Sequence, residues 1–138
     1  MTKKLRPYQD QFITDIYASW NTGDKNVLAV LPTGAGKTVC FCKIAIVQAS
    51  LGVPVAVMVH RKELVQQISL TLSSENITHN IISPRSVVKG IIAAQRRLYK
   101  KQFYDCNASI TVISVDTLNS RIIKHERWAK NIKLWITD

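Results

Sequence analysis

The feature that most constrains the fold is a short glycine-containing segment between two apolar patterns. "PTGAGKT", residues 32–38, follows the continuously apolar run Asn26 to Leu31 and precedes a helical pattern from about Lys37 to Ser50. An apolar run without alternation is typical of a parallel strand that is covered on both faces. Gly34 and Gly36 let the backbone curl so that N–H groups point at an anion, and the following helix adds its positive end. The order of strand, loop and helix therefore predicts a phosphate-binding loop in an α/β fold.

The residue types in this loop favour a nucleoside triphosphate with Mg²⁺. Lys37 would neutralise the β- and γ-phosphates, and the hydroxyl of Thr38 would bind the metal ion. Leu31 occupies the position of the first glycine in the common loop pattern. The alternative is a plain turn between a strand and a helix, with Lys37 exposed. The candidate phosphate-binding residues are Pro32, Thr33, Gly34, Ala35, Gly36, Lys37 and Thr38.

The rest of the chain alternates between helical and strand patterns, which predicts one α/β domain over residues 1–138. We expect helices at Pro7 to about Asn21–Asp24, Lys62 to Leu72, Pro84 to Tyr104 and within Leu118–Asn131, and further strands at Pro54–Val59, Thr78–Ser83, Ser109–Val115 and Lys133–Asp138. The apolar strands indicate a mainly parallel sheet with helices on both faces.

The charge and composition of the chain limit the classes of molecule that it is expected to bind. The chain of 138 residues is 46% hydrophobic, and its net charge of +10 favours a polyanion such as nucleic acid or an anionic membrane surface. We find no apolar run long enough to span a membrane and no signal peptide, so we expect a cytoplasmic protein. The three cysteines, Cys40, Cys42 and Cys106, are odd in number, and small buried side chains are favoured over metal ligands.

Three segments together resemble a known family. "LRPYQ" at residues 5–9, "PTGAGKT" and "VHRKELVQQ" at residues 59–67 resemble the first RecA-like domain of superfamily 2 helicases and translocases, in the DEAD/DEAH-type and restriction-enzyme-like branch. The resemblance spans nearly the whole chain. It implies a RecA-like fold that binds ATP with Mg²⁺ and works on nucleic acid, DNA in preference to RNA, together with a second RecA-like domain in cis or a partner in trans.

The resemblance also implies roles for residues outside the loop. Gln9 would read the adenine edge, with Arg6 near the base; simple packing at a helix start is the alternative for both. Arg61 and Lys62, at a strand end and helix start, would contact the nucleic-acid backbone, which suits phosphate on physical grounds as well; a solvated cap is the alternative. A fourth segment, "VISVDTLNSR", resembles a further backbone-contacting stretch, with candidates Thr117, Asn119 and Arg121.

The last residues, "LWITD", resemble the entry to the family's metal-binding motif. Asp138 then matches the acid that holds Mg²⁺, and the acid that activates water would follow it. We therefore expect a partial domain that lacks its second RecA-like partner, with little ATP hydrolysis or unwinding by this chain alone. The alternative is a naturally short, non-catalytic protein that binds ATP and nucleic acid. A small-molecule kinase would need a lid and phosphate-clamping arginines, and is disfavoured.

The segment from Arg85 to Lys133 holds much of the excess positive charge. Within it, four cations are expected on one helical ridge, since positions three and four apart are neighbours; they are Arg96, Arg97, Lys100 and Lys101. With aromatic residues nearby, this ridge could follow a nucleic-acid backbone. A solvated charged face and a protein-docking surface are the alternatives.

Overall fold

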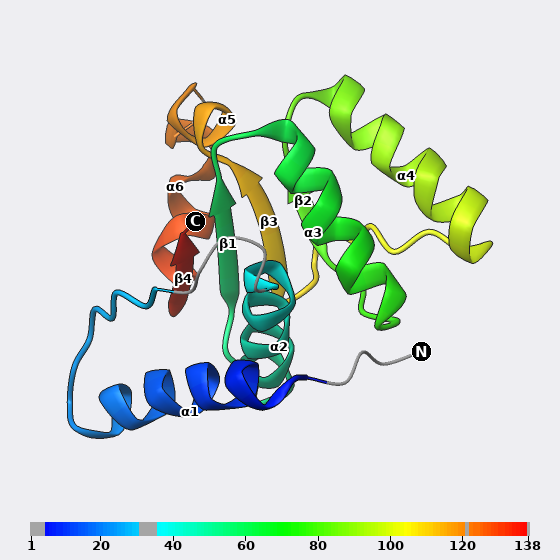
Figure 1. The fold of residues 1–138 in the computed structure, drawn as a ribbon. Helices are drawn as coiled ribbons and strands as arrows, with labels where there is room; N and C mark the ends of the chain where they lie inside the picture. Colours follow the sequence, from blue (N-terminus) through cyan, green and yellow to red (C-terminus); the bar gives the residue numbers. More distant parts are fainter. Residues whose placement is uncertain (1–4, 31–35, 121, 138) are drawn as a thin grey trace.

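The computed structural model describes residues 5–30, 36–120 and 122–137, and it has the expected α/β architecture (Figure 1). Four parallel strands form a sheet in the order β2-β3-β1-β4. The strands are β1 (Val55–Val59), β2 (Asn80–Ile82), β3 (Ile110–Ser114) and β4 (Leu134–Thr137). The helices are α1 (Pro7–Asn21), α2 (Lys37–Ser50), α3 (Lys62–Ser74), α4 (Arg85–Tyr99), α5 (Val115–Ser120) and α6 (Ile122–Asn131).

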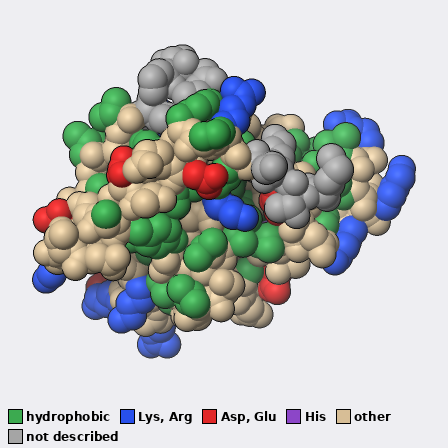
Figure 2. Space-filling model, turned by 60° about the horizontal axis from the view of Figure 1, so that its bottom comes forward, with side chains coloured by type: hydrophobic (Ala, Val, Ile, Leu, Met, Phe, Trp, Pro, Cys, Tyr) green, Lys and Arg blue, Asp and Glu red, His purple; other side chains and the backbone are tan. Residues whose placement is uncertain are grey.

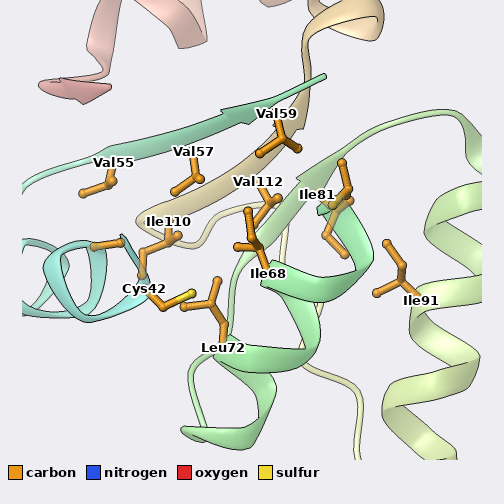
Figure 3. Close-up of a cluster of buried hydrophobic side chains, with 12 residues drawn as sticks. Cys42, Val55, Val57, Val59, Ile68, Leu72, Ile81, Ile91, Ile110 and Val112 are labelled. Atoms are coloured by element: carbon orange, nitrogen blue, oxygen red, sulfur yellow. The ribbon is translucent and has the colours of Figure 1, made fainter. Parts of the chain in front are cut away.

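Alternate residues of the central strands divide the core into two layers. On one face, Val55, Val57 and Val59 of β1 pack with Ile110 and Val112 of β3 against buried side chains of α2, α3 and α4 (Figure 3). On the other face, a smaller cluster joins Met58 and Ile113 of the strands to Leu118 of α5 and Trp128 of α6. The sheet is therefore covered by helices on both faces, as the continuous apolar runs predict.

The parallel arrangement brings four chain segments to one edge of the sheet. The carboxyl ends of β1, β2 and β3 lead directly into α3, α4 and α5. The register aligns Val59 with Ser114 and Met58 with Thr137, so that these strand ends lie level with one another. This edge, called the carboxyl edge below, is where ligands bind in open parallel sheets.

The prediction of a strand at Asn26–Leu31 is wrong for residues 26–30, the part that the structure describes, because these residues pair with no strand. Val27 and Ala29 pack on the cluster that α1 and α2 form with β4, whereas the side chains of Leu28 and Val30 are 92% and 81% exposed. A strand buried on both faces needs a layer on each, and the described residues cover only one face of this segment. It lies beside β4 along an apolar groove without adding to the ladder.

The fourth helix is shorter than the pattern predicts. It ends at Tyr99 because Lys100 takes a left-handed conformation, with φ of 59°. The chain then turns back, and the Phe103 amide donates to Oε1 of Gln95 at 2.9 Å. A bridge between Tyr104 and His79 follows, so that Lys101 and the residues after it belong to a connection and not to the helix.

Within the described residues, every helix is too short or too polar to cross a lipid bilayer.

Candidate nucleotide and nucleic-acid site

The described end of the predicted phosphate loop is the start of α2. Gly36 precedes the helix with φ of 78° and ψ of 39°, in the left-handed region that favours glycine. Lys37 and Thr38 follow in the first turn and are half-buried. The N–H groups of a first turn point out along the helix axis and make a favourable environment for an anion. The other predicted loop residues, Pro32, Thr33, Gly34 and Ala35, lie outside the described residues.

The carboxamide of Gln9 lies directly against the loop. A Cβ placed on residue 36 would overlap the side-chain amide nitrogen of Gln9. The other end of the same carboxamide is held in place, because Oε1 accepts a hydrogen bond from the Arg6 amide at 2.8 Å. Gln9 is buried in the first turn of α1, while Arg6 is exposed and its guanidinium donates to the Tyr8 hydroxyl at 3.3 Å. The structure thus brings two predicted nucleotide-binding residues, Gln9 and Gly36, into contact although they are distant in sequence.

The predicted nucleic-acid contacts that follow β1 and β3 lie together at the carboxyl edge. Arg61 and Lys62 begin α3 directly after β1, and both side chains are exposed. Thr117 and Asn119 lie in α5 directly after β3, the neighbour of β1. Asn119 is exposed, but Thr117 is only 4% exposed, so burial favours Asn119 over Thr117 for contact with a ligand. Arg121 lies outside the described residues.

The predicted metal-binding residues fall only partly within the described residues. Thr38 is in the first turn of α2, and β4 runs to Thr137, while Asp138 lies outside the described residues. In the part of the chain that the structure describes, no group of three or more His, Cys, Asp and Glu side chains is placed to hold a metal ion. Cys40 and Cys42 are buried in α2, as expected for small apolar side chains, whereas Cys106 is exposed, so the expectation is wrong for that residue.

The basic cluster predicted near the end of α4 lies away from the carboxyl edge. Because α4 begins at that edge after β2, its last turn, with Arg96 and Arg97, lies at the other end of the helix (Figure 1). Arg96 donates to Oε1 of Gln102 at 2.8 Å, and Lys101 stands over the Phe103 ring at 5.1 Å from its centroid. The predicted ridge omitted two exposed cations of the same helix, Arg85 and Lys89, which their spacing of four residues could have revealed.

Comparison with known proteins agrees with this arrangement. Residues 2–138 match the family described as the type III restriction enzyme, res subunit. In structure, the chain is similar to a nuclease-deletion mutant of the Type ISP restriction-modification enzyme LlaGI in complex with a DNA substrate mimic, with a TM-score of 0.60 and 16% identity. The match covers 99% of this chain and 17% of that one, and at this identity it shows the fold alone. No curated protein matches the sequence.

Proposed function

The chain belongs to the family of the type III restriction enzyme res subunit, a superfamily 2 helicase-like family, and from that premise we propose that it binds ATP with Mg²⁺ at the start of α2 and nucleic acid at the carboxyl edge. The chain is an ATP-dependent helicase-like domain with a RecA-like α/β fold. It spans 17% of the restriction enzyme that it resembles in structure. We propose that residues 1–138 are the N-terminal ATP-binding part of a protein that hydrolyses ATP as it moves along nucleic acid.

The observation that carries the proposal is the contact between Gln9 and Gly36. Gly36 has a positive φ, which lets a loop turn its N–H groups towards phosphate oxygens, and a Cβ there would meet the amide nitrogen of Gln9. Gln9 is fixed against it by the cap of α1. A carboxamide beside a phosphate-binding turn can select the base of the same nucleotide, because its NH₂ donates and its oxygen accepts. These features fit a nucleotide in this position.

The residues of α2 supply the phosphate chemistry in this proposal. The Lys37 ammonium neutralises the terminal phosphates, and the first-turn N–H groups donate hydrogen bonds to the phosphate oxygens. Mg²⁺, held by the Thr38 hydroxyl and by Asp138, would neutralise charge on the same phosphates. Arg61, Lys62 and Asn119 hold the nucleic-acid backbone at the neighbouring strand ends, with Thr117 and Arg121 as further candidates.

Nucleotide binding is tested by titrating a fluorescent ATP analogue with Mg²⁺ into the chain. We expect Lys37→Ala to weaken binding about tenfold or more, since it removes a charge that faces phosphate. Lys43→Ala is the matched control, because it removes the same side chain six positions further along α2, and it should bind like the unchanged chain. Equal affinities for all three proteins would sink the proposal.

Base selection is tested separately with Gln9→Glu. The carboxylate can still accept the hydrogen bond from the Arg6 amide that caps α1. It lacks the NH₂ group beside Gly36. We expect the unchanged chain to prefer ATP to GTP in competition and the variant to lose that preference; a variant that keeps it would show that Gln9 only packs against the loop.

A further inference from the structure

A line of cations runs along the whole outer face of α4. We call four cations the basic stripe; Lys100 caps the end of the helix, and the intervals between successive members are four, seven and four residues. They are Arg85, Lys89, Arg96 and Lys100. At 100° per residue they fall within an arc of about 60°, and they extend over about 22 Å. All four side chains are exposed. In Figure 2, Lys and Arg side chains gather at the right-hand edge of the molecule, the side on which Figure 1 places α4.

Acidic side chains do not compensate this charge. No Asp or Glu occurs from Asn76 to Tyr104, a segment that carries the stripe together with Arg97 and Lys101. None of these six cations forms an ion pair with any described residue. The stripe therefore carries positive charge that no acid in its own segment of the chain balances.

Helix stability does not account for the stripe. Arg85 begins α4, where the positive end of the helix disfavours a cation, although Arg96 and Arg97 at the other end are favoured. Arg85 with Lys89, and Arg96 with Lys100, are also like-charged pairs four residues apart, which destabilise an isolated helix by a few tenths of a kcal/mol each, roughly 0.2–0.5. A bound polyanion would relieve both repulsions.

The opposite face of α4 fixes the direction in which the stripe points. Ile91 and Ala94 are buried, and Val87 and Val88 pack on the core. Gln95 is fully buried and bonded at both ends, with Nε2 donating to Ser69 of α3 at 3.1 Å and Oε1 accepting from the Phe103 amide. Because α4 cannot turn about its axis without breaking these contacts, the cations stay directed at solvent.

We propose that the basic stripe is a second nucleic-acid contact, which holds the phosphate backbone of a DNA duplex as it leaves the carboxyl edge. The stripe begins at that edge, because Arg85 follows the end of β2, and it leads away along the side of the domain. Its length corresponds to about six phosphates of one strand. The inference rests on the proposed nucleic-acid function and extends it to a surface that is separate from Arg61 and Lys62.

The test compares two variants of equal net charge. One replaces the stripe with Gln at positions 85, 89, 96 and 100. The control replaces four other exposed cations, Lys25, Arg127, Lys130 and Lys133, with Gln. Each substitution set lowers the formal net charge from +10 by four, to +6. A third variant, Arg61→Gln with Lys62→Gln, reports on the carboxyl edge alone.

Binding of a labelled DNA duplex of about 20 base pairs, longer than the stripe, is measured over a range of salt concentrations, with and without ATP. We expect the stripe variant to bind DNA at least about tenfold more weakly at low salt. The slope of the logarithm of the association constant against the logarithm of the salt concentration should become shallower by about 3 to 4, because each of four phosphate contacts contributes about 0.9. The control should lose far less affinity and keep its slope.

Three results would overturn the inference in different ways. If the stripe variant matches the control while the variant at positions 61 and 62 binds weakly, the edge binds DNA but the stripe does not. If the unchanged chain does not bind the duplex, the nucleic-acid part of the proposed function fails as well. If the stripe variant keeps its DNA affinity but no longer binds vesicles of anionic phospholipid, the stripe serves a membrane surface.

Discussion

At the scale of single residues, Gly36 has the strictest requirement in the described chain. Its φ of 78° is one that side chains with a Cβ rarely adopt, and the Gln9 carboxamide occupies the space where that Cβ would lie. The first condition concerns the backbone and the second concerns a tertiary contact. Glycine satisfies both conditions without strain.

Replacing this glycine with alanine should therefore destabilise the fold. We expect Gly36→Ala to lower the free energy of unfolding by about 2 kcal/mol, from the left-handed backbone and from the displaced Gln9 side chain. Chemical denaturation measures the change.

Gly90→Ala is the control, because Gly90 lies within α4 and a Cβ there has nothing within 4 Å. It should instead raise the free energy of unfolding by about 0.5 to 1 kcal/mol, as expected for alanine in a helix. Equal effects of the two substitutions would contradict the overlap with Gln9.

At the scale of elements, a buried chain of polar side chains joins β2 to α3 and α4. His79, which precedes β2, accepts a hydrogen bond at Nε2 from the Ser69 hydroxyl at 2.6 Å, and its Nδ1 donates to the Ile77 carbonyl at 3.0 Å. Ser69 in turn accepts from Gln95 of α4. This assignment requires a neutral imidazole, since a protonated ring would have no acceptor for the Ser69 proton. The network positions α4, and with it the basic stripe, relative to the sheet.

The network makes stability depend on pH in a defined direction. Burial lowers the pKa of His79 from its ordinary value of 6.5, against a smaller opposing effect of the bond to Ile77. Below pH 6.5 the unfolded chain therefore takes up a proton that the folded chain refuses, so the free energy of unfolding falls as pH falls towards the lowered pKa. Above that window His79 is neutral in both states and its contribution is constant.

Denaturation of the unchanged chain and of His79→Gln across this pH range measures the effect. The amide of the variant does not titrate, so the difference in unfolding free energy between the two proteins should shrink as pH falls. A difference that stays constant from neutral pH to below 6.5 would mean that His79 is not held neutral in the folded chain.

At the scale of the whole molecule, stability is distributed unevenly across the sheet. β1 and β3 are paired on both sides and buried by helices on both faces, whereas β2 and β4 form its edges. The segment beside β4, residues 26–30, forms no backbone hydrogen-bond ladder with a described strand, and its Leu28 and Val30 side chains are exposed to solvent.

Hydrogen exchange should follow this order. We expect the amides of Val55–Val59 and Ile110–Ser114 to exchange slowest, near the limit of global unfolding, and those of residues 27–30 to exchange fastest. Exchange measured by NMR or mass spectrometry resolves the segments. Protection of residues 27–30 comparable to that of Leu134–Thr137 would show that the segment pairs with β4 in solution after all.

Local patterns were sufficient to predict most elements. The helices beginning at Pro7, Lys37 and Lys62 start where predicted, and the strands around residues 55–59, 110–114 and 134–137 lie within the predicted ranges. Several of these elements have strong local signals, such as the proline at the start of α1 and the unbroken apolar runs of the strands. The errors occur where contacts with distant parts of the chain decide the secondary structure. A strand at Asn26–Leu31 would need a packed layer on each face. The end of α4 is set by the left-handed Lys100 and by the hydrogen bond between Gln95 and Phe103.

Residue types at short spacings were enough to predict the family, the α/β class and the excess of positive charge, and they carry the glycine-lysine-threonine motif. Packing of the elements brought Gln9 against Gly36 and buried Thr117. Packing also joined His79 to Gln95 through Ser69. The position of α4 set where the basic stripe begins, at the carboxyl edge. The physical reason is distance along the chain: hydrophobic periodicity and turn chemistry act over a few residues, whereas contacts between remote side chains exist only once helices and strands have packed.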